Sequence, residues 1–115
     1  MMATICKRLG AIGLVTDGGV RDLTTVKELG FHYFAPGATP SHGNYEIVEA
    51  GLDINVGGTV VRSGDLIHAD ENGVGVFPAD RIADLLEAAH IVRKNEAERM
   101  AAMTDPDRDP TSLWK

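Results

Sequence analysis

The sequence has little cysteine, few aromatic residues and no long apolar run. Its one cysteine, Cys6, cannot form a disulfide within the chain, and its place on a predicted helix face favours a small core residue over a catalytic thiol. No run approaches the roughly 18 apolar residues of a membrane-spanning helix. No basic segment followed by an apolar one suggests export. We therefore expect a cytoplasmic protein without contact to a membrane.

Positive charge is also scarce. The 115 residues include 11 Lys and Arg against 17 Asp and Glu, which gives a net charge of −6 without any basic cluster. Nucleic acid is therefore not an expected partner, since lysine and arginine bind its phosphates. The length is sufficient for one domain with a core that needs no disulfide or structural metal.

The chain is organised around residues 14–22, LVTDGGVRD. An apolar run passes into a glycine pair and ends in Arg21 and Asp22. This order is typical of a buried strand whose end delivers polar groups to the rim of a sheet. Gly18 and Gly19 can adopt backbone angles closed to other residues, which would let a ligand come close.

A strand–helix–strand unit is predicted around this stretch. In order, we expect a helix that ends at Gly10, a strand over 11–15 covered on both faces, a short helix over 23–29 that ends at Gly30, and a strand over 31–35. The two strands should be parallel, as in almost all such units. Ligands on these sheets bind beyond the carboxyl ends of the strands, where Arg21 and Asp22 would lie. The apolar face of the first helix should comprise Met2, Ile5, Cys6 and Leu9.

The second half predicts short strands with tight turns, followed by one helix. Strands are expected over 45–50, 52–56, 59–61, 66–69 and 74–77, paired antiparallel. We interpret Gly57-Gly58 as a bulge or a close backbone approach. The last helix should begin near Pro78 and run to about Met103, and Ile82, Leu85, Leu86, Ala89 and Val92 share one face.

The predicted domain comprises residues 1–103, and residues 104–115 should form an irregular tail. Two Asp-Pro steps in this tail disfavour a helix. Trp114 is interpreted either as an anchor on a neighbouring surface or as part of a disordered end.

Arg21 and Asp22 have two interpretations from the residues alone. The guanidinium offers a planar set of donors that matches a carboxylate or an oxyanion, and the carboxylate can hold Mg²⁺. Alternatively, Asp22 is the N-cap of the following helix, with its side chain bonded to the backbone N–H near Thr25, and Arg21 is simply solvated. Both interpretations stay open at this level.

The other candidates are weaker. Asp65 and Asp70 lie in turn sequences, where turn chemistry explains both. His32, His42, His68 and His90 show no spacing of metal ligands. His42, in a loop rich in proline and glycine, is the histidine that most suggests a functional role.

Several segments together resemble a known family. They are the helix that ends at Gly10, GLVTDGGVRD at 13–22, FAPG at 34–37, GGTVVRSGDL at 57–66 and DENGVGVFP at 70–78. In this order they resemble the family of the regulator of ribonuclease E activity A and of 4-hydroxy-4-methyl-2-oxoglutarate aldolase, formerly labelled demethylmenaquinone methyltransferases. The resemblance covers roughly residues 1–90.

The resemblance implies an α/β fold: a swivelling α/β/β layered domain with a mixed sheet, assembled as a trimer or hexamer. It implies a class II aldolase, a carbon–carbon lyase that releases pyruvate from a 4-hydroxy-2-oxo acid and often decarboxylates oxaloacetate. By resemblance Arg21 binds the 2-oxo acid and stabilises the enolate, and Asp22 anchors Mg²⁺ or Mn²⁺. A metal ion and an arginine suit this chemistry because both offset enolate charge.

The chain departs from the family pattern at its start. The family's Gly-Glu or Gly-Asp loop, which holds the substrate carboxylate, falls ahead of Met1, and no capping residue precedes the first helix. We therefore expect an N-terminally truncated domain that is inactive or weak alone. The family's acidic residue from a neighbouring subunit has no identifiable counterpart, and Ser63 replaces the usual proline.

Two other functions remain. Ribonuclease regulators share the family and act by binding a protein, without catalysis. A phosphohistidine swivelling domain has a related architecture but needs a histidine soon after its glycine pair. Here Thr59, Val60 and Val61 follow Gly57-Gly58, which argues against that class.

Overall fold

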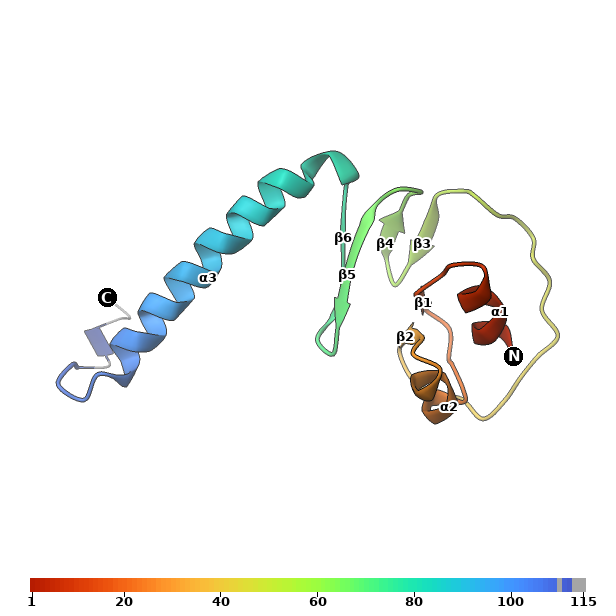
Figure 1. Ribbon diagram of the computed structural model, residues 1–115, viewed down its shortest axis with the longest axis horizontal. Coiled ribbons are helices and arrows are strands. Elements are labelled where there is room, and N and C mark those ends of the chain that lie inside the picture. The colour runs from red at the N-terminus through yellow and green to blue at the C-terminus, as the bar shows by residue number, and fades with distance from the viewer. Residues whose placement is uncertain (110, 113–115) are drawn as a thin grey trace. The chain divides into compact units, whose positions relative to one another are not determined.

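The computed structural model describes residues 1–109, 111 and 112. It contains two compact units, Met1–Phe77 and Pro78–Lys115. Helices and small sheets are mixed, as in an α/β fold (Figure 1). The elements are α1 (Met2–Arg8), β1 (Gly13–Val15), α2 (Leu23–Glu28), β2 (His32–Phe34), β3 (Ile54–Val56), β4 (Thr59–Val61), β5 (Leu66–Asp70), β6 (Gly73–Phe77), the 3₁₀ helix η1 (Ala79–Arg81) and α3 (Ile82–Thr104).

The predicted strand–helix–strand unit is confirmed. β1 and β2 pair in parallel with Gly13 opposite His32 and Val15 opposite Phe34, and α2 lies between them in the chain. The expectation that the first strand is covered on both faces is wrong, because the side chain of Leu14 is 42% exposed. One face of this small sheet therefore remains open.

A small core joins α1, α2 and the start of β2. Ala3, Val26 and Phe31 are buried, and Cys6 packs against them, as expected of a small core residue. The ammonium group of Lys7 also donates a hydrogen bond to the carbonyl oxygen of Leu29, at the end of α2. This contact links α1 to the end of α2.

The predicted helix ends are confirmed, whereas the predicted apolar face of α1 is only partly correct. Gly10 and Gly30 follow the two helices with φ of 96° and 68°, the left-handed conformation that closes a helix at its C-terminus. On α1, however, Ala3 faces the core, and Ile5 and Leu9 are 47% and 83% exposed. The core contacts only the narrow stripe of α1 that Ala3 and Cys6 form.

The predicted antiparallel pairing is confirmed in two hairpins, β3–β4 and β5–β6. The interpretation of Gly57-Gly58 as a bulge or close approach is wrong. Val56 pairs with Thr59, so the two glycines form a two-residue hairpin turn, with φ of 58° and 86°. Such turns require positive φ at both positions, which glycine adopts without strain.

The strand predicted over residues 45–50 is wrong. These residues have no regular structure and are all exposed; Ile47 and Val48 keep 76% and 87% of their surface. Figure 1 shows them within the long connection between β2 and β3. A strand needs a partner for its N–H and C=O groups, and in the described part of the chain none pairs with this segment.

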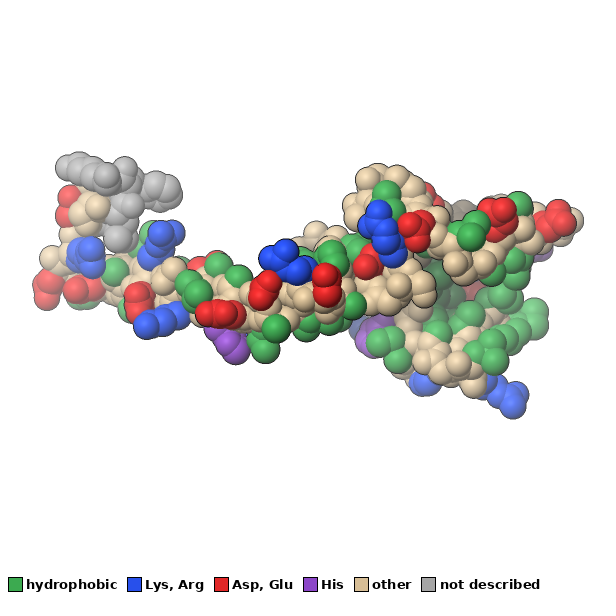
Figure 2. All heavy atoms as spheres, turned by 90° about the horizontal axis from the view of Figure 1, so that it is seen from above, with side chains coloured by type: hydrophobic (Ala, Val, Ile, Leu, Met, Phe, Trp, Pro, Cys, Tyr) green, Lys and Arg blue, Asp and Glu red, His purple; other side chains and the backbone are tan. Residues whose placement is uncertain are grey.

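The last helix ends at Thr104, one residue beyond the prediction. It follows η1, and Arg81 Nε lies 2.8 Å from Asp84 Oδ2 in its first turn. None of its residues is buried, so the predicted apolar face is not covered within this unit. Acidic and basic side chains are interspersed along it in Figure 2. Trp114, the possible anchor of the predicted tail, lies outside the described residues.

The helices that the structure describes include no candidate for a membrane-spanning segment. Among the described residues, no helix combines the required length with the required apolar character.

The β5–β6 turn confirms the predicted turn chemistry. Asp70 Oδ1 accepts a hydrogen bond from the backbone N–H of Asn72 at 2.8 Å, and Oδ2 accepts one from its side-chain amide at 3.3 Å. The backbone bond chiefly, then the amide bond, lowers the pKa of Asp70 below its ordinary 3.8. Asp65 similarly accepts a bond from the N–H of Arg62 at 2.8 Å.

Substitution Asn72→Ala should raise the pKa of Asp70 toward 3.8 because it removes the amide donor. The folded pKa lies below the unfolded one, so ionised Asp70 stabilises the fold above the unfolded pKa, and this contribution disappears as pH falls through the folded pKa. Carboxyl ¹³C shifts followed by NMR between pH 2 and 6 measure the change. Asp109, whose pKa Thr111 lowers in the other unit, is an internal control. An unchanged Asp70 titration would contradict the assigned cause.

Candidate functional site

Arg21 and Asp22 lie in the connection between β1 and α2. Just before them, the backbone of Val20 is hydrogen-bonded to the loop that follows β2. The N–H of Val20 donates to the carbonyl oxygen of Gly37 at 3.1 Å, and the N–H of Thr39 donates to that of Val20 at 2.8 Å. These bonds tie the chain after β1 to the loop after β2. Arg21 therefore starts from a fixed backbone position.

Asp22 has an unusual backbone conformation. Its φ of 61° is the one positive value among the non-glycine residues that the structure describes. The left-handed conformation costs roughly 1–2 kcal/mol for a residue with a side chain, and asparagine and aspartate adopt it most readily. Such strain persists where surrounding contacts enforce it, which is common at functional sites.

This conformation corrects one expectation. Asp22 is the N-cap of α2 by position, but its side chain makes no capping hydrogen bond, because capping side chains normally project from an extended backbone. Gly18 and Gly19, which can adopt backbone angles closed to other residues, do not have positive φ, whereas Asp22 does.

The two side chains of the candidate site lie side by side. Arg21 Nε is 3.7 Å from Asp22 Oδ2, and the side chains are 49% and 62% exposed. An exposed pair at this distance contributes little to stability. Because both side chains are exposed, both charged groups are accessible to a ligand. They line an open depression of about 440 Å³, together with Leu23, Ala38, Thr39 and Pro40.

The arrangement suits a hard divalent cation and an anion together. Mg²⁺ is commonly bound through one or two carboxylates, with water and substrate oxygens in the other positions. Across residues 1–109, 111 and 112, no group of three or more His, Cys, Asp and Glu side chains could hold a metal ion. Asp22 is the one carboxylate among the residues that line the depression; its oxygens are of the kind that a hard cation takes, whereas a structural zinc site needs four ligands.

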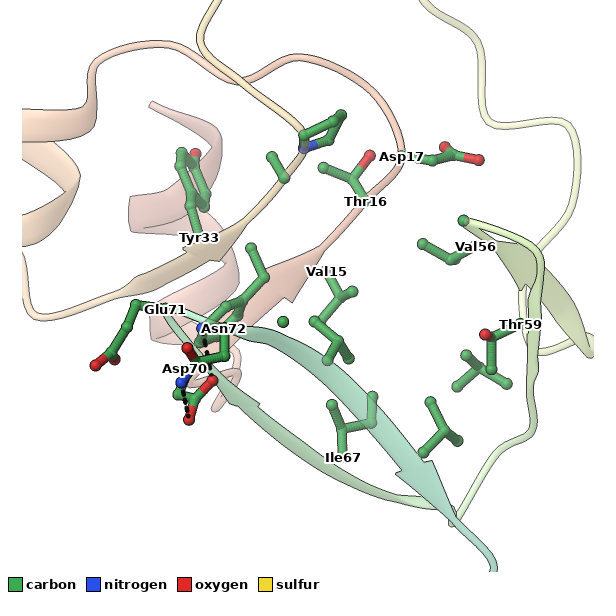
Figure 3. Close-up of a pocket in the computed structure, with 18 residues that line it drawn as sticks. Val15, Thr16, Asp17, Tyr33, Val56, Thr59, Ile67, Asp70, Glu71 and Asn72 are labelled. Carbon is green, nitrogen blue, oxygen red and sulfur yellow. Dashed lines mark hydrogen bonds between the residues drawn. The ribbon is translucent and has the colours of Figure 1, made fainter. Parts of the chain in front are cut away.

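A larger hollow of about 590 Å³ lies elsewhere in the same unit, and neither Arg21 nor Asp22 lines it. Figure 3 shows apolar side chains such as Val15, Val56 and Ile67 around it, with Asp17 at one edge. The turn of Asp70 and Asn72 lies at another edge, where dashed lines mark their hydrogen bonds. Its lining is mainly apolar and lacks an adjacent cation and carboxylate, so we place the candidate chemistry at Arg21.

The histidines do not join the candidate site. His42 is exposed in the irregular connection after β2 and lines neither hollow. His32, His68 and His90 are also exposed and belong to no metal-binding group of the described residues.

Sequence reasoning missed Thr39, which lines the depression of Arg21 and Asp22. The available signal was its position in a loop directly after the second parallel strand. The carboxyl ends of neighbouring parallel strands meet at one edge, which brings this loop close to Arg21.

Comparisons with known proteins add independent information. The family model described as Aldolase/RraA matches residues 1–76. A Halalkalibacterium halodurans protein named "Putative 4-hydroxy-4-methyl-2-oxoglutarate aldolase" is 33% identical over 102 residues, which are 88% of this chain and 49% of that protein. An uncharacterized protein of Methanocaldococcus jannaschii is 34% identical over 88 residues, 76% of this chain and 42% of that protein.

A third relative, Protein DlpA of Legionella pneumophila, is 29% identical over 91 residues, 77% of this chain and 15% of that protein. The chain spans about half the length or less of these curated relatives. The family match includes Arg21, Asp22 and Thr39 and ends before α3.

Proposed function

Because the chain belongs to the Aldolase/RraA family, we propose that it carries a class II aldolase site, which releases pyruvate from a 4-hydroxy-2-oxo acid with a divalent metal ion. A compound like 4-hydroxy-4-methyl-2-oxoglutarate is the proposed substrate, as the name of one relative suggests. The observation that carries the proposal is the Arg21–Asp22 pair, exposed on one depression, with its aspartate in a left-handed conformation.

Arg21 is proposed to bind the 2-oxo acid and stabilise its enolate. As the C4 hydroxyl gives its proton to water and becomes a carbonyl, the C3–C4 bond breaks and its electron pair passes to the pyruvate part. The negative charge gathers on the C2 oxygen, and protonation at C3 then gives pyruvate. The guanidinium can donate parallel hydrogen bonds to this oxygen and to the neighbouring carboxylate. A donor placed where charge develops lowers the barrier more than it tightens substrate binding.

Asp22 is proposed to hold Mg²⁺ or Mn²⁺. When bound, such an ion polarises the C2 carbonyl and stabilises the enolate. The carboxylate lies beside Arg21, so both can act on one substrate group. Loss of carbon dioxide from oxaloacetate forms the same enolate, and we propose oxaloacetate decarboxylation as a second activity of the site.

We also propose the finer architecture on the basis of family membership. It comprises the swivelling α/β/β layered domain and assembly as a trimer or hexamer. Two further groups complete the proposed site: a loop that binds the substrate carboxylate and an acidic residue from a neighbouring subunit.

Pyruvate release tests the function. 4-Hydroxy-4-methyl-2-oxoglutarate is supplied with Mg²⁺ or Mn²⁺, and pyruvate is measured by coupling to lactate dehydrogenase. The assay uses the 115-residue chain and a form extended at its N-terminus by a segment that carries the family's Gly-Glu or Gly-Asp loop. We expect turnover in the extended form, and EDTA should abolish it. Absence of metal-dependent pyruvate release from both forms would contradict the proposal.

The alternative is a regulator that binds a ribonuclease without catalysis. The description of the matching family names RraA beside aldolase, and this name is the observation that supports the alternative. Direct ribonuclease binding without lyase activity in either form would favour it over the aldolase.

A further inference from the structure

Thr39 has a more fixed position than the rest of its loop. Across residues 36–44, which the structure describes in full, Thr39 is half-buried and the other residues are exposed. Its N–H donates to the carbonyl oxygen of Val20 at 2.8 Å, and Val20 directly precedes Arg21. A β-bridge pairs Val20 with Ala38 in parallel. The backbone of Thr39 is therefore held against the backbone that carries Arg21.

The side chain of Thr39 is held as well. A Cβ atom added to Gly19 would lie 2.9 Å from Thr39 Cγ2 and 3.1 Å from its Cβ. The threonine side chain thus occupies the space that a side chain at position 19 would need. Since a β-branched side chain has few χ1 choices, this packing fixes the direction of the hydroxyl.

The hydroxyl itself has little to bind within the protein. Oγ1 accepts one long hydrogen bond, from the N–H of Ser41 at 3.4 Å. Within the described residues its O–H has no acceptor. A threonine that lines a depression beside Arg21 and Asp22, with its methyl group packed and its O–H unused, has the features of a ligand-binding group.

We propose that Thr39 is a binding residue of the oxo-acid site, whose hydroxyl donates a hydrogen bond to an oxygen of the bound 2-oxo acid while Arg21 pairs with the negative charge. This inference rests on the proposed function. Arg21 and Thr39 reach the depression from different segments, so together they fix the orientation of a small, planar substrate as well as its charge.

The test is the binding of oxalate, in the presence of Mg²⁺, to the 115-residue chain and to the extended form, measured by isothermal titration calorimetry. Oxalate is a planar dianion that resembles the enolate of pyruvate. Thr39→Val keeps the packed shape and removes the hydroxyl, and we expect roughly 10- to 100-fold weaker binding. Thr39→Ser keeps the hydroxyl and should stay within about threefold of the unmodified chain. Thr59→Val, in an exposed strand position, is the matched control and should bind normally.

The outcomes separate this inference from the proposed function. Unchanged oxalate affinity in Thr39→Val, with binding lost in Arg21→Ala, would overturn the role of Thr39 and leave the site intact. No Mg²⁺-dependent binding of oxalate by either unmodified form would overturn both. A loss in Thr39→Ser without a loss in Thr39→Val would show a packing role alone and overturn the inference. If Thr39→Val does not fold, Thr39→Ala, which adds no bulk, decides in its place, and normal affinity there counts against the proposal.

Discussion

Replacing Arg21 with alanine should lower pyruvate release by about 100- to 1,000-fold, the effect of removing one donor to a developing oxyanion. The loss should fall mainly on kcat, because the charge on the C2 oxygen is larger in the transition state than in the substrate. The fold should be little affected, since the side chain is 49% exposed and its ion pair with Asp22 is long, at 3.7 Å. Steady-state kinetics in whichever form of the protein turns over faster, with a thermal melt of the same sample, measure both.

Arg62 provides the matched control for Arg21. It also forms an exposed ion pair with an aspartate, Nε to Asp53 Oδ2 at 3.3 Å, and its side chain is 61% exposed. Arg62→Ala removes the same charge from the chain and should leave kcat unchanged. Arg21→Lys keeps the charge without the planar set of donors, so its activity should lie between those of the unmodified protein and Arg21→Ala. Equal rates for Arg21→Ala and Arg62→Ala would remove Arg21 from the site.

The parts of the fold that the sequence predicts correctly are set by neighbouring residues. Gly10 and Gly30 end their helices, because the left-handed angle needed there is a property of one residue. The hairpins likewise follow from alternating residues around short turns. Residues 45–50 have an equally strand-like composition but no partner in the described residues. The composition of a segment does not specify whether a distant strand pairs with it, so residues 45–50 alone could not show that the predicted strand is absent.

The same distinction holds at the candidate site. Arg21 and Asp22 could be selected by residue type and by position after a strand. The left-handed backbone of Asp22 and the approach of Thr39 could not, because both depend on the contact between Val20 and the loop after β2. Gly19 illustrates the point: its lack of a side chain makes room for Thr39, whereas the sequence suggested room for a ligand.

Asp22→Asn should reduce metal-dependent pyruvate release by roughly 100-fold, the upper end of the effects found for groups that only support a metal ligand. The amide keeps the size of the side chain but loses the negative charge that a hard cation prefers. Asparagine also tolerates the left-handed conformation at φ 61°, so the melting temperature should change little. Activity titrated with Mg²⁺ and Mn²⁺ should show a weaker apparent metal affinity as well as a lower maximum.

Two further variants separate metal binding from backbone strain at position 22. Asp22→Gly removes the carboxylate and relieves the strain, so it should be as inactive as Asp22→Asn without loss of stability. Asp22→Ala removes the carboxylate and retains the strain of roughly 1–2 kcal/mol without the local tolerance of aspartate, so it alone should also melt at a lower temperature. Asp17→Asn, at an exposed acid that lines the other hollow, should keep normal metal dependence. If Asp22→Asn and Asp22→Gly keep normal metal dependence too, Asp22 is no metal ligand, and its strained conformation must serve to direct Arg21 alone.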